Sequence, residues 1–244
     1  MKAIRSHIRT PRLGVRTCSL IAAVLALLTA TSPALALRNP NPRILPVGSS
    51  AFGKTLGEWS AVWWKFGIET PVLGNPFAEG GAFPLSGSVW GLAAPLGDAT
   101  FELTLPVGKA LVVALITLEC SSLEPPESEF HGDTEEEQAE CARFWADHIK
   151  DVSVEIDGVP AQNVESYRVV SPQFSFTAPD PNILAVPGGG PGTGVADGYY
   201  VMLPPMSKGL HTIRIGGAFH AAVAEGDPFD LDLVFENLFL ITVE

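Results

Sequence analysis

Four side chains of this 244-residue sequence have the chemistry and the setting to contact a ligand: Trp64, Arg168, Asp197 and His211. Arg168 lies in SYRVVSP, among expected strand residues of a chain that is short of basic groups. If Arg168 points inward it needs a partner, because an unpaired buried charge is costly. Glu58 and Asp197 are the partners we consider. A structural ion pair is the favoured interpretation, and a carboxylate-binding arginine is the alternative.

His211 lies on an expected strand, on the same face as Ile213 and Ile215. An imidazole on an apolar strand face is more often hydrogen-bonded and partly buried than a ligand-binding group. The other histidines of the mature chain, His131, His148 and His220, occur in unrelated contexts. We therefore expect His211 to be mainly structural and keep it as a weak binding candidate.

No residue is assigned a catalytic role. No serine lies in a G-x-S-x-G elbow, and no glycine pattern of a nucleotide-binding loop precedes a helix. A catalytic pair of carboxylates is defined by a distance that the sequence does not give. Oxygen-rich segments occur at 131–137 and 225–232, but neither has the spacing of a calcium loop. We predict no cofactor and no metal site, with a bound calcium ion as a minor alternative.

An aromatic helix is predicted in GKTLGEWSAVWWKFG, residues 53–67. Thr55 and Glu58 have the capping-box spacing of a helix start. Trp59 and Trp63 recur at helical spacing on one face, which predicts that both pack in the core. Trp64 is turned about 100° away from Trp63 and is the indole we expect to be most exposed. Exposed aromatic groups often serve binding, so Trp64 is the candidate among the three.

The N-terminus reads as a secretory signal peptide, residues 1–36. Five basic residues without an acid precede the apolar run LIAAVLALL, and small residues end at Ala36. Nine apolar residues are too few to span a bilayer, so no membrane span is expected after cleavage. The formal charge of the whole chain is −12, and cleavage makes it more acidic. Such a chain is repelled by nucleic acid. We expect a secreted protein, either periplasmic or extracellular.

Two cysteines, Cys120 and Cys141, remain after cleavage, because Cys18 lies in the signal peptide. An even pair in an exported chain predicts a disulfide. Cys141 lies on the inward face of a second predicted helix, which starts at the capping box of Thr134 and Glu137 and runs to about Lys150. The disulfide would join this helix to the end of the strand at 110–118.

The rest of the mature chain is predicted to be β structure. After an extended leader at 37–52, a single domain at 53–244 contains eight to eleven short strands with two helical decorations, which favours an antiparallel β-sandwich, immunoglobulin-like or jelly-roll-like. The segment 110–118 is apolar on both faces and is expected to be a central strand. The segment 181–198, rich in Gly and Pro, is predicted to be a long loop. Its glycine-rich part, 187–198, could line a ligand site, and a flexible loop without a ligand is the alternative.

Four quoted segments together resemble a family of uncharacterised exported bacterial proteins. They are GKTLGEWSAVWWKF, LPVGKALVVALI, IDGVPAQNVESYRVVSPQFSF and DGYYVMLPPMSKGLHTIRIGG. The family's members share a GEWSxxWW helix, a P-x-GK turn and a final GxHTI strand. The resemblance covers most of the mature chain and implies a sandwich fold and export. It implies no activity and no functional residues.

Three functions remain open at this point. The favoured one is a non-enzymatic binding module of the cell envelope or extracellular space, with a glycan, a small molecule or an envelope protein as ligand. The second is a hydrolase whose carboxylates converge only in the fold. The third is a structural or assembly subunit, for which an unpaired edge strand would be evidence.

Overall fold

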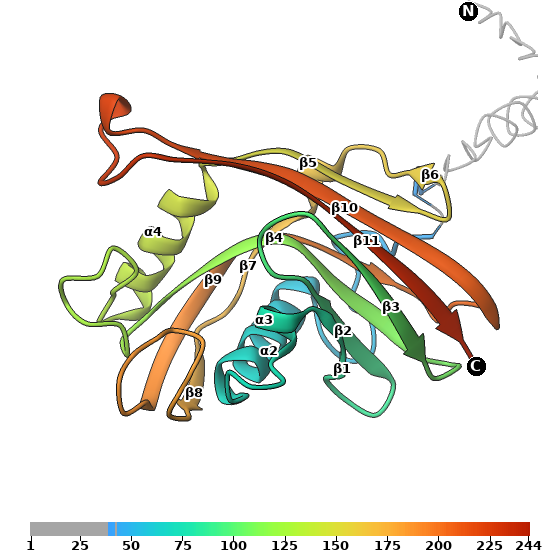
Figure 1. The fold of residues 1–244 in the computed structure, drawn as a ribbon, viewed down its shortest axis with the longest axis horizontal. Helices are drawn as coiled ribbons and strands as arrows, with labels where there is room; N and C mark the ends of the chain where they lie inside the picture. The colour runs from blue at the N-terminus through green and yellow to red at the C-terminus, as the bar shows by residue number, and fades with distance from the viewer. Residues whose placement is uncertain (1–38, 42) are drawn as a thin grey trace, which may run out of the picture. The chain divides into compact units, whose positions relative to one another are not determined.

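The computed structural model describes residues 39–41 and 43–244. The expected signal peptide and the first residues of the leader lie outside the described residues. Residues 39–244 group into one compact unit, a β-sandwich of two sheets with three helices. In Figure 1, β5, β10 and β11 cross over β4 and β9. The sheet-forming patterns of the sequence therefore fold as predicted, into two packed layers.

The first sheet has the order β1-β2-β4-β9-β7, and β8 pairs with the first half of β9. Most neighbours are antiparallel, but β2 and β4 run parallel. The bounds are β1 (Gly81–Pro84), β2 (Val89–Ala93), β4 (Ala110–Ser121), β7 (Arg168–Val170), β8 (Phe174–Ala178) and β9 (Gly190–Leu203).

The second sheet has the order β3-β11-β10-β5-β6, and its β3 and β11 are parallel. The C-terminal part of the chain forms one long strand, β11, that pairs with β10 over its whole length. The bounds are β3 (Ala99–Leu105), β5 (Ile149–Ile156), β6 (Val159–Pro160), β10 (Gly209–Ala221) and β11 (Leu231–Val243).

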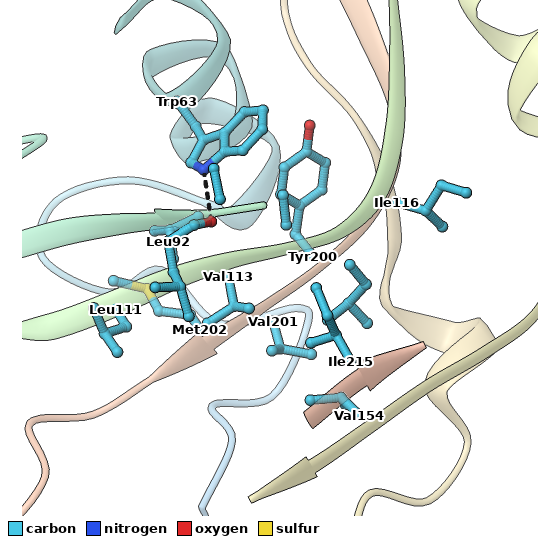
Figure 2. Packing of buried hydrophobic residues seen from close by; sticks show 14 of the residues in the cluster. Trp63, Leu92, Leu111, Val113, Ile116, Val154, Tyr200, Val201, Met202 and Ile215 are labelled. Atoms are coloured by element: carbon cyan, nitrogen blue, oxygen red, sulfur yellow. Dashed lines mark hydrogen bonds between the residues drawn. The ribbon is translucent and has the colours of Figure 1, made fainter. Parts of the chain in front are cut away.

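The tryptophan segment forms helix α2 (Leu56–Glu69), and its capping box of Thr55 and Glu58 is confirmed. Trp59 and Trp63 are buried, as predicted. Trp63 donates its indole N–H to the carbonyl of Leu92 at 3.2 Å. Figure 2 shows Trp63 and Tyr200 on one side of the first sheet. The short helix α3 (Pro76–Glu79) follows, and its Phe77 stacks on Trp63 at 3.9 Å between ring centres.

The opposite side of the first sheet faces the second sheet. In Figure 2, Val201 of β9 points to that side, toward Ile215 of β10 and Val154 of β5, and all three are buried. The first sheet is thus covered on both faces. This explains why β4, its central strand, is apolar at nearly every position.

The predicted disulfide between Cys120 and Cys141 is present, with 6.1 Å between the Cα atoms. It joins β4 to helix α4 (Glu135–Ala146), which begins at the predicted capping box of Thr134 and Glu137. The helix ends four residues before the predicted end at Lys150, because the chain from Ile149 already pairs with β10 as β5.

The prediction of a loop across 181–198 is wrong for its second half. Only residues 181–189 form a loop, because β9 begins at Gly190. The glycines of β9 allow close approach of neighbouring side chains: a Cβ on Gly192 would lie 2.7 Å from the ring of Phe176, and one on Gly194 would lie 2.5 Å from Glu119. These glycines serve packing within a strand, not loop flexibility.

Candidate functional site

A cleft of about 920 Å³ opens beside β4. One wall comes from α2, α3 and the loop at 182–185, and the other from β11 and the segment before it. The apolar side chains of the walls are Trp63, Trp64, Phe77, Ile183, Leu184, Phe229, Leu231, Leu233 and Phe235. Residues 94–96 and Phe130 also line the cleft. Clefts of this size and character are typical of ligand sites.

The cleft reaches both faces of β4. Consecutive strand residues point to opposite faces, and the lining includes the consecutive residues Thr117, Leu118 and Glu119. A space that touches both faces of a strand must pass around one of its edges. The edge toward β9 is closed by the antiparallel ladder, so the cleft lies along the other edge of β4.

Glu119 is the most unusual group in the cleft. The residue is 5% exposed, and Oε1 of its carboxyl group has no hydrogen-bond partner among the described residues. Burial, reinforced by the neighbouring carboxylate of Glu124, raises the pKa of Glu119 to about 8. Burial also raises the pKa of Glu124. At neutral pH Glu119 is largely a neutral acid that can donate or accept a hydrogen bond.

Two further polar groups line the cleft. Asn237 is 1% exposed, and its Oδ1 lacks a hydrogen-bond partner within the described part of the chain. Thr117 accepts the indole N–H of Trp64 at 3.2 Å, and its hydroxyl lies 2.6 Å from that of Tyr200. The cleft is therefore apolar with a few fixed polar groups, which is the usual composition of a specific small-ligand or chain-binding site.

Among the four binding candidates from the sequence, Trp64 lies in this cleft. Arg168 and Asp197 lie away from it and pair with each other in a two-pronged contact, with both N–O distances 2.8 Å. Asp147 of the α4 C-terminus adds a third contact to the guanidinium at 2.6 Å. These bonds raise the pKa of Arg168 despite its partial burial.

Arg168 is therefore a structural link between β7, β9 and α4, with Asp197 as its partner. Glu58, the other partner considered, accepts hydrogen bonds from Thr55 at the start of α2 instead. The side chain of Asp197 is 1% exposed, and the guanidinium satisfies both of its oxygens. Four of the five guanidinium N–H groups are thus used within the fold, since Nη2 also donates to the carbonyl of Arg143 at 3.2 Å.

His211 lies in a second hollow, of about 530 Å³, on strands β3, β10 and β11. Its Nδ1 is 3.0 Å from the carboxylate of Asp157, and its Nε2 is 3.4 Å from the hydroxyl of Ser207. The order acid, imidazole, hydroxyl resembles that of a catalytic triad. However, Nε2 lies closer to the carbonyl oxygen of Ser207, at 2.9 Å.

A carbonyl acceptor requires Nε2 to carry a proton. Burial by itself would lower the pKa of His211, but the hydrogen bonds to Asp157 and to the Ser207 carbonyl raise it overall. An imidazole that holds its protons cannot act as the general base for a hydroxyl nucleophile. Asp157 also pairs with Arg43 of the leader at 2.7 Å, so the arrangement fastens the leader and the 157–158 turn to β10.

The described residues hold neither a cluster of metal-binding side chains nor a helix that could span a membrane. In the range 39–244, leaving out residue 42, no three side chains of His, Cys, Asp or Glu gather closely enough to hold a metal ion. None of the helices in that range has the length and apolar character needed to cross a bilayer.

Sequence reasoning missed Glu119 and Asn237. Both could have been found in the sequence, because each is a polar residue within an otherwise apolar strand pattern. Glu119 follows Thr117 on one face of an otherwise apolar strand, and Asn237 falls between Phe235 and Phe239 on the inward face of β11. Polar residues at such positions are either paired or functional.

No protein-family model matches the chain, and no curated protein matches it. Two solved structures show weak similarity. One is a cysteine protease inhibitor, EhICP2, from Entamoeba histolytica, at 9% identity over 60% of this chain and 97% of that one, with a TM-score of 0.20. The other is Amebosin, at 11% identity over 62% and 100% of the two chains, with a TM-score of 0.17. Similarity at this level supports no conclusion about this protein.

Proposed function

We propose that this chain is an exported, non-enzymatic binding module whose ligand is predominantly apolar and occupies the cleft beside β4. The observation that carries the proposal is the composition of the cleft: aromatic and aliphatic walls around a buried carboxyl group whose Oε1 has no hydrogen-bond partner in the described part of the chain. Each 100 Å² of apolar ligand surface removed from water there contributes about 2.5 kcal/mol. The disulfide, which persists in oxidising compartments, supports export.

Among the ligand classes considered from the sequence, the cleft favours an apolar envelope component over a glycan. Sugar hydroxyls lose their hydrogen bonds to water on entering a site and need replacements. The cleft offers few: the side chains with carboxyl, amide or hydroxyl groups along its walls are Glu119, Glu124, Asn237, Thr117 and Asn182. Trp64 is partly buried, and its indole N–H already donates to Thr117. Its ring therefore does not form the flat, exposed surface on which sugars usually stack.

A hydrolase is the second candidate, because Glu119 and Glu124 line the same cleft and raised pKa values are common in catalytic acids. The apolar surroundings that raise the pKa of Glu119 also exclude the polar substrates that a pair of acids cleaves. Release of product from aryl glycosides by the wild type, and its loss in Glu119→Gln, would support this candidate over a binding module.

Binding of the neutral fluorophore Nile red tests the proposal. We expect saturable fluorescence enhancement, with energy transfer from Trp63 and Trp64. The substitution Ala94→Trp places an indole in the cleft and should weaken binding at least about tenfold. Ala161→Trp is the matched control, since Ala161 is also partly buried but lies outside the cleft. Absence of saturable binding to the folded wild type, or equal loss in both variants, would overturn the proposal.

A further inference from the structure

The edge of β4 along the cleft lacks a neighbouring strand. On this side β2 pairs with the first part of β4 alone, and the last pair of that ladder is Leu92 with Val113. At the far end, Ser121 forms an isolated bridge with His131. Between these points, no strand of the described chain pairs with this edge. Pro95 gives a physical reason, because it lies two positions after the last residue of β2 and has no N–H to continue a ladder.

The backbone groups that face the open edge are those of Thr117 and Glu119. In an antiparallel pair, alternate residues direct both backbone groups at the partner and the others direct both away. Ser121 exchanges bonds with Phe130 and Gly132, away from β9. The register with β9 is regular from Ile116 to Ser121. The backbone N–H and C=O groups of Glu119 and Thr117, two and four positions before Ser121, therefore also point away from β9.

These backbone groups decide between ligand classes. A lipid-like ligand would cover them without replacing their bonds to water, and each buried unpaired group costs about 1–3 kcal/mol. An extended polypeptide supplies donors and acceptors at matching intervals. Resting on the proposed function, we propose that the ligand is an extended apolar segment of another protein, which adds to the open edge of β4 as a strand.

The cleft also specifies the segment. Because walls cover both faces of β4, the side chains on both faces of the added strand meet apolar groups, so the segment is apolar throughout and does not alternate. The open stretch, Ala114–Cys120, accommodates a segment of about seven residues at roughly 3.3 Å each. Glu119 and Glu124 lie along it, so a hydrogen-bond donor beside the apolar run, such as a lysine, complements their carboxyl oxygens.

Synthetic peptides separate strand addition from apolar adsorption. The probe is acetyl-Lys-Val-Ala-Leu-Val-Ala-Lys-amide, titrated against the full mature chain by calorimetry. Two isomers carry backbone N-methyl groups, one at the second, fourth and sixth residues and one at the third and fifth. In an added strand only alternate N–H groups face β4. We expect one isomer to bind like the parent and the other to lose at least about tenfold in affinity.

A matched pair of variants tests the same contact from the protein side. Glu119→Ala removes the carboxyl group and keeps the N–H, whereas Glu119→Pro removes both. The N–H of residue 119 faces away from β9, so proline is compatible with the ladder on that side. We expect the proline variant to bind the peptide more weakly than the alanine variant. In the wild type, hydrogen exchange at the Thr117 and Glu119 amides should slow on peptide binding, independently of how the variants fold.

The results distinguish this inference from the proposed function. Equal binding of both N-methylated isomers, or unchanged exchange at Thr117 and Glu119, would overturn strand addition. Binding of Nile red without binding of the parent peptide would also overturn it, while leaving the apolar site intact. Loss of Nile red binding would overturn the proposed function itself.

Discussion

Glu119 and Gly194 fit together across the ladder between β4 and β9: a Cβ on Gly194 would lie 2.5 Å from Oε1 of Glu119. The absence of a side chain at 194 makes the space in which the buried carboxyl group rests. Because Gly194 lies in a strand whose glycines serve packing, the position of Glu119 at the cleft depends on the sequence of β9 as well as that of β4.

We therefore predict that Gly194→Ala destabilises the fold by about 1–3 kcal/mol through overpacking. Truncation of the carboxyl group in Glu119→Ala should restore part of this loss, so the two substitutions should be non-additive in a double-mutant cycle. Urea unfolding of the four proteins measures both quantities. Gly87→Ala is the control, because a Cβ there meets no atom within 4 Å. Strictly additive effects of the two substitutions would contradict the fit.

The raised pKa of Glu119 predicts a pH-dependent stability. Its ordinary value is 4.5 and its value in the fold is about 8. Between these limits the folded chain keeps a proton that the unfolded chain releases, so stability falls as the pH rises through this window. The slope is at most about 1.4 kcal/mol per pH unit. Below pH 4.5 both states are protonated and Glu119 contributes no slope.

Glu119→Gln removes this titration while keeping the shape of the side chain. The difference in Tm between Glu119→Gln and the wild type should therefore grow in favour of the variant from pH 5 to pH 8. Thermal unfolding of both proteins at several pH values measures it. A difference that stays constant over that range would show that Glu119 is ionised in the fold, contrary to our account.

The Arg168–Asp197 pair should stabilise the fold through burial of the aspartate. Arg168→Ala leaves the carboxylate of Asp197 buried without its partner, and we expect a loss of about 3–5 kcal/mol. Removal of both side chains should cost less than the sum of the single losses. Denaturant unfolding checks both values. Because the pair lies outside the cleft, Nile red should bind the folded Arg168→Ala variant as it binds the wild type.

The disulfide should stabilise the fold because it closes a loop and so lowers the conformational entropy of the unfolded chain. Cys120 and Cys141 are 21 positions apart, and on the chain-entropy model removal of the bond costs about 3 kcal/mol. The double variant Cys120→Ser, Cys141→Ser should show this loss in urea, and a reducing agent should shift the unfolding midpoint of the wild type only. An equal midpoint for oxidised and reduced wild type would refute the prediction.

Local patterns allowed much of the fold to be predicted. The capping boxes, the amphipathic aromatic helix and the doubly apolar strand β4 each encode their structure within a few residues. The disulfide was predicted from the even number of cysteines left in a chain that we expect to be exported. The first half of β9 was mispredicted as a loop, because its glycine content is typical of loops. In the fold these glycines make room for the side chains of Phe176 and Glu119, which are distant in sequence.

The candidate site was less accessible to sequence reasoning, because a cleft is a relationship between segments. Trp64, Glu119 and Asn237 lie far apart in the chain and meet only through the packing of α2, β4 and β11. The partner of Arg168 could be narrowed to two residues, but the choice of Asp197 over Glu58 required the pairing of β7 with β9.

The central claim is that the cleft beside β4 is the ligand site, and NMR mapping tests it most directly. Amide ¹H–¹⁵N spectra of the mature chain are recorded during titration with Nile red. Our account predicts shifts concentrated at the cleft, at Thr117, Leu118, Phe235 and the indole N–H of Trp64, with the hollow around His211 unaffected. Shifts concentrated around His211, or no shifts at the cleft under saturating probe, would contradict it.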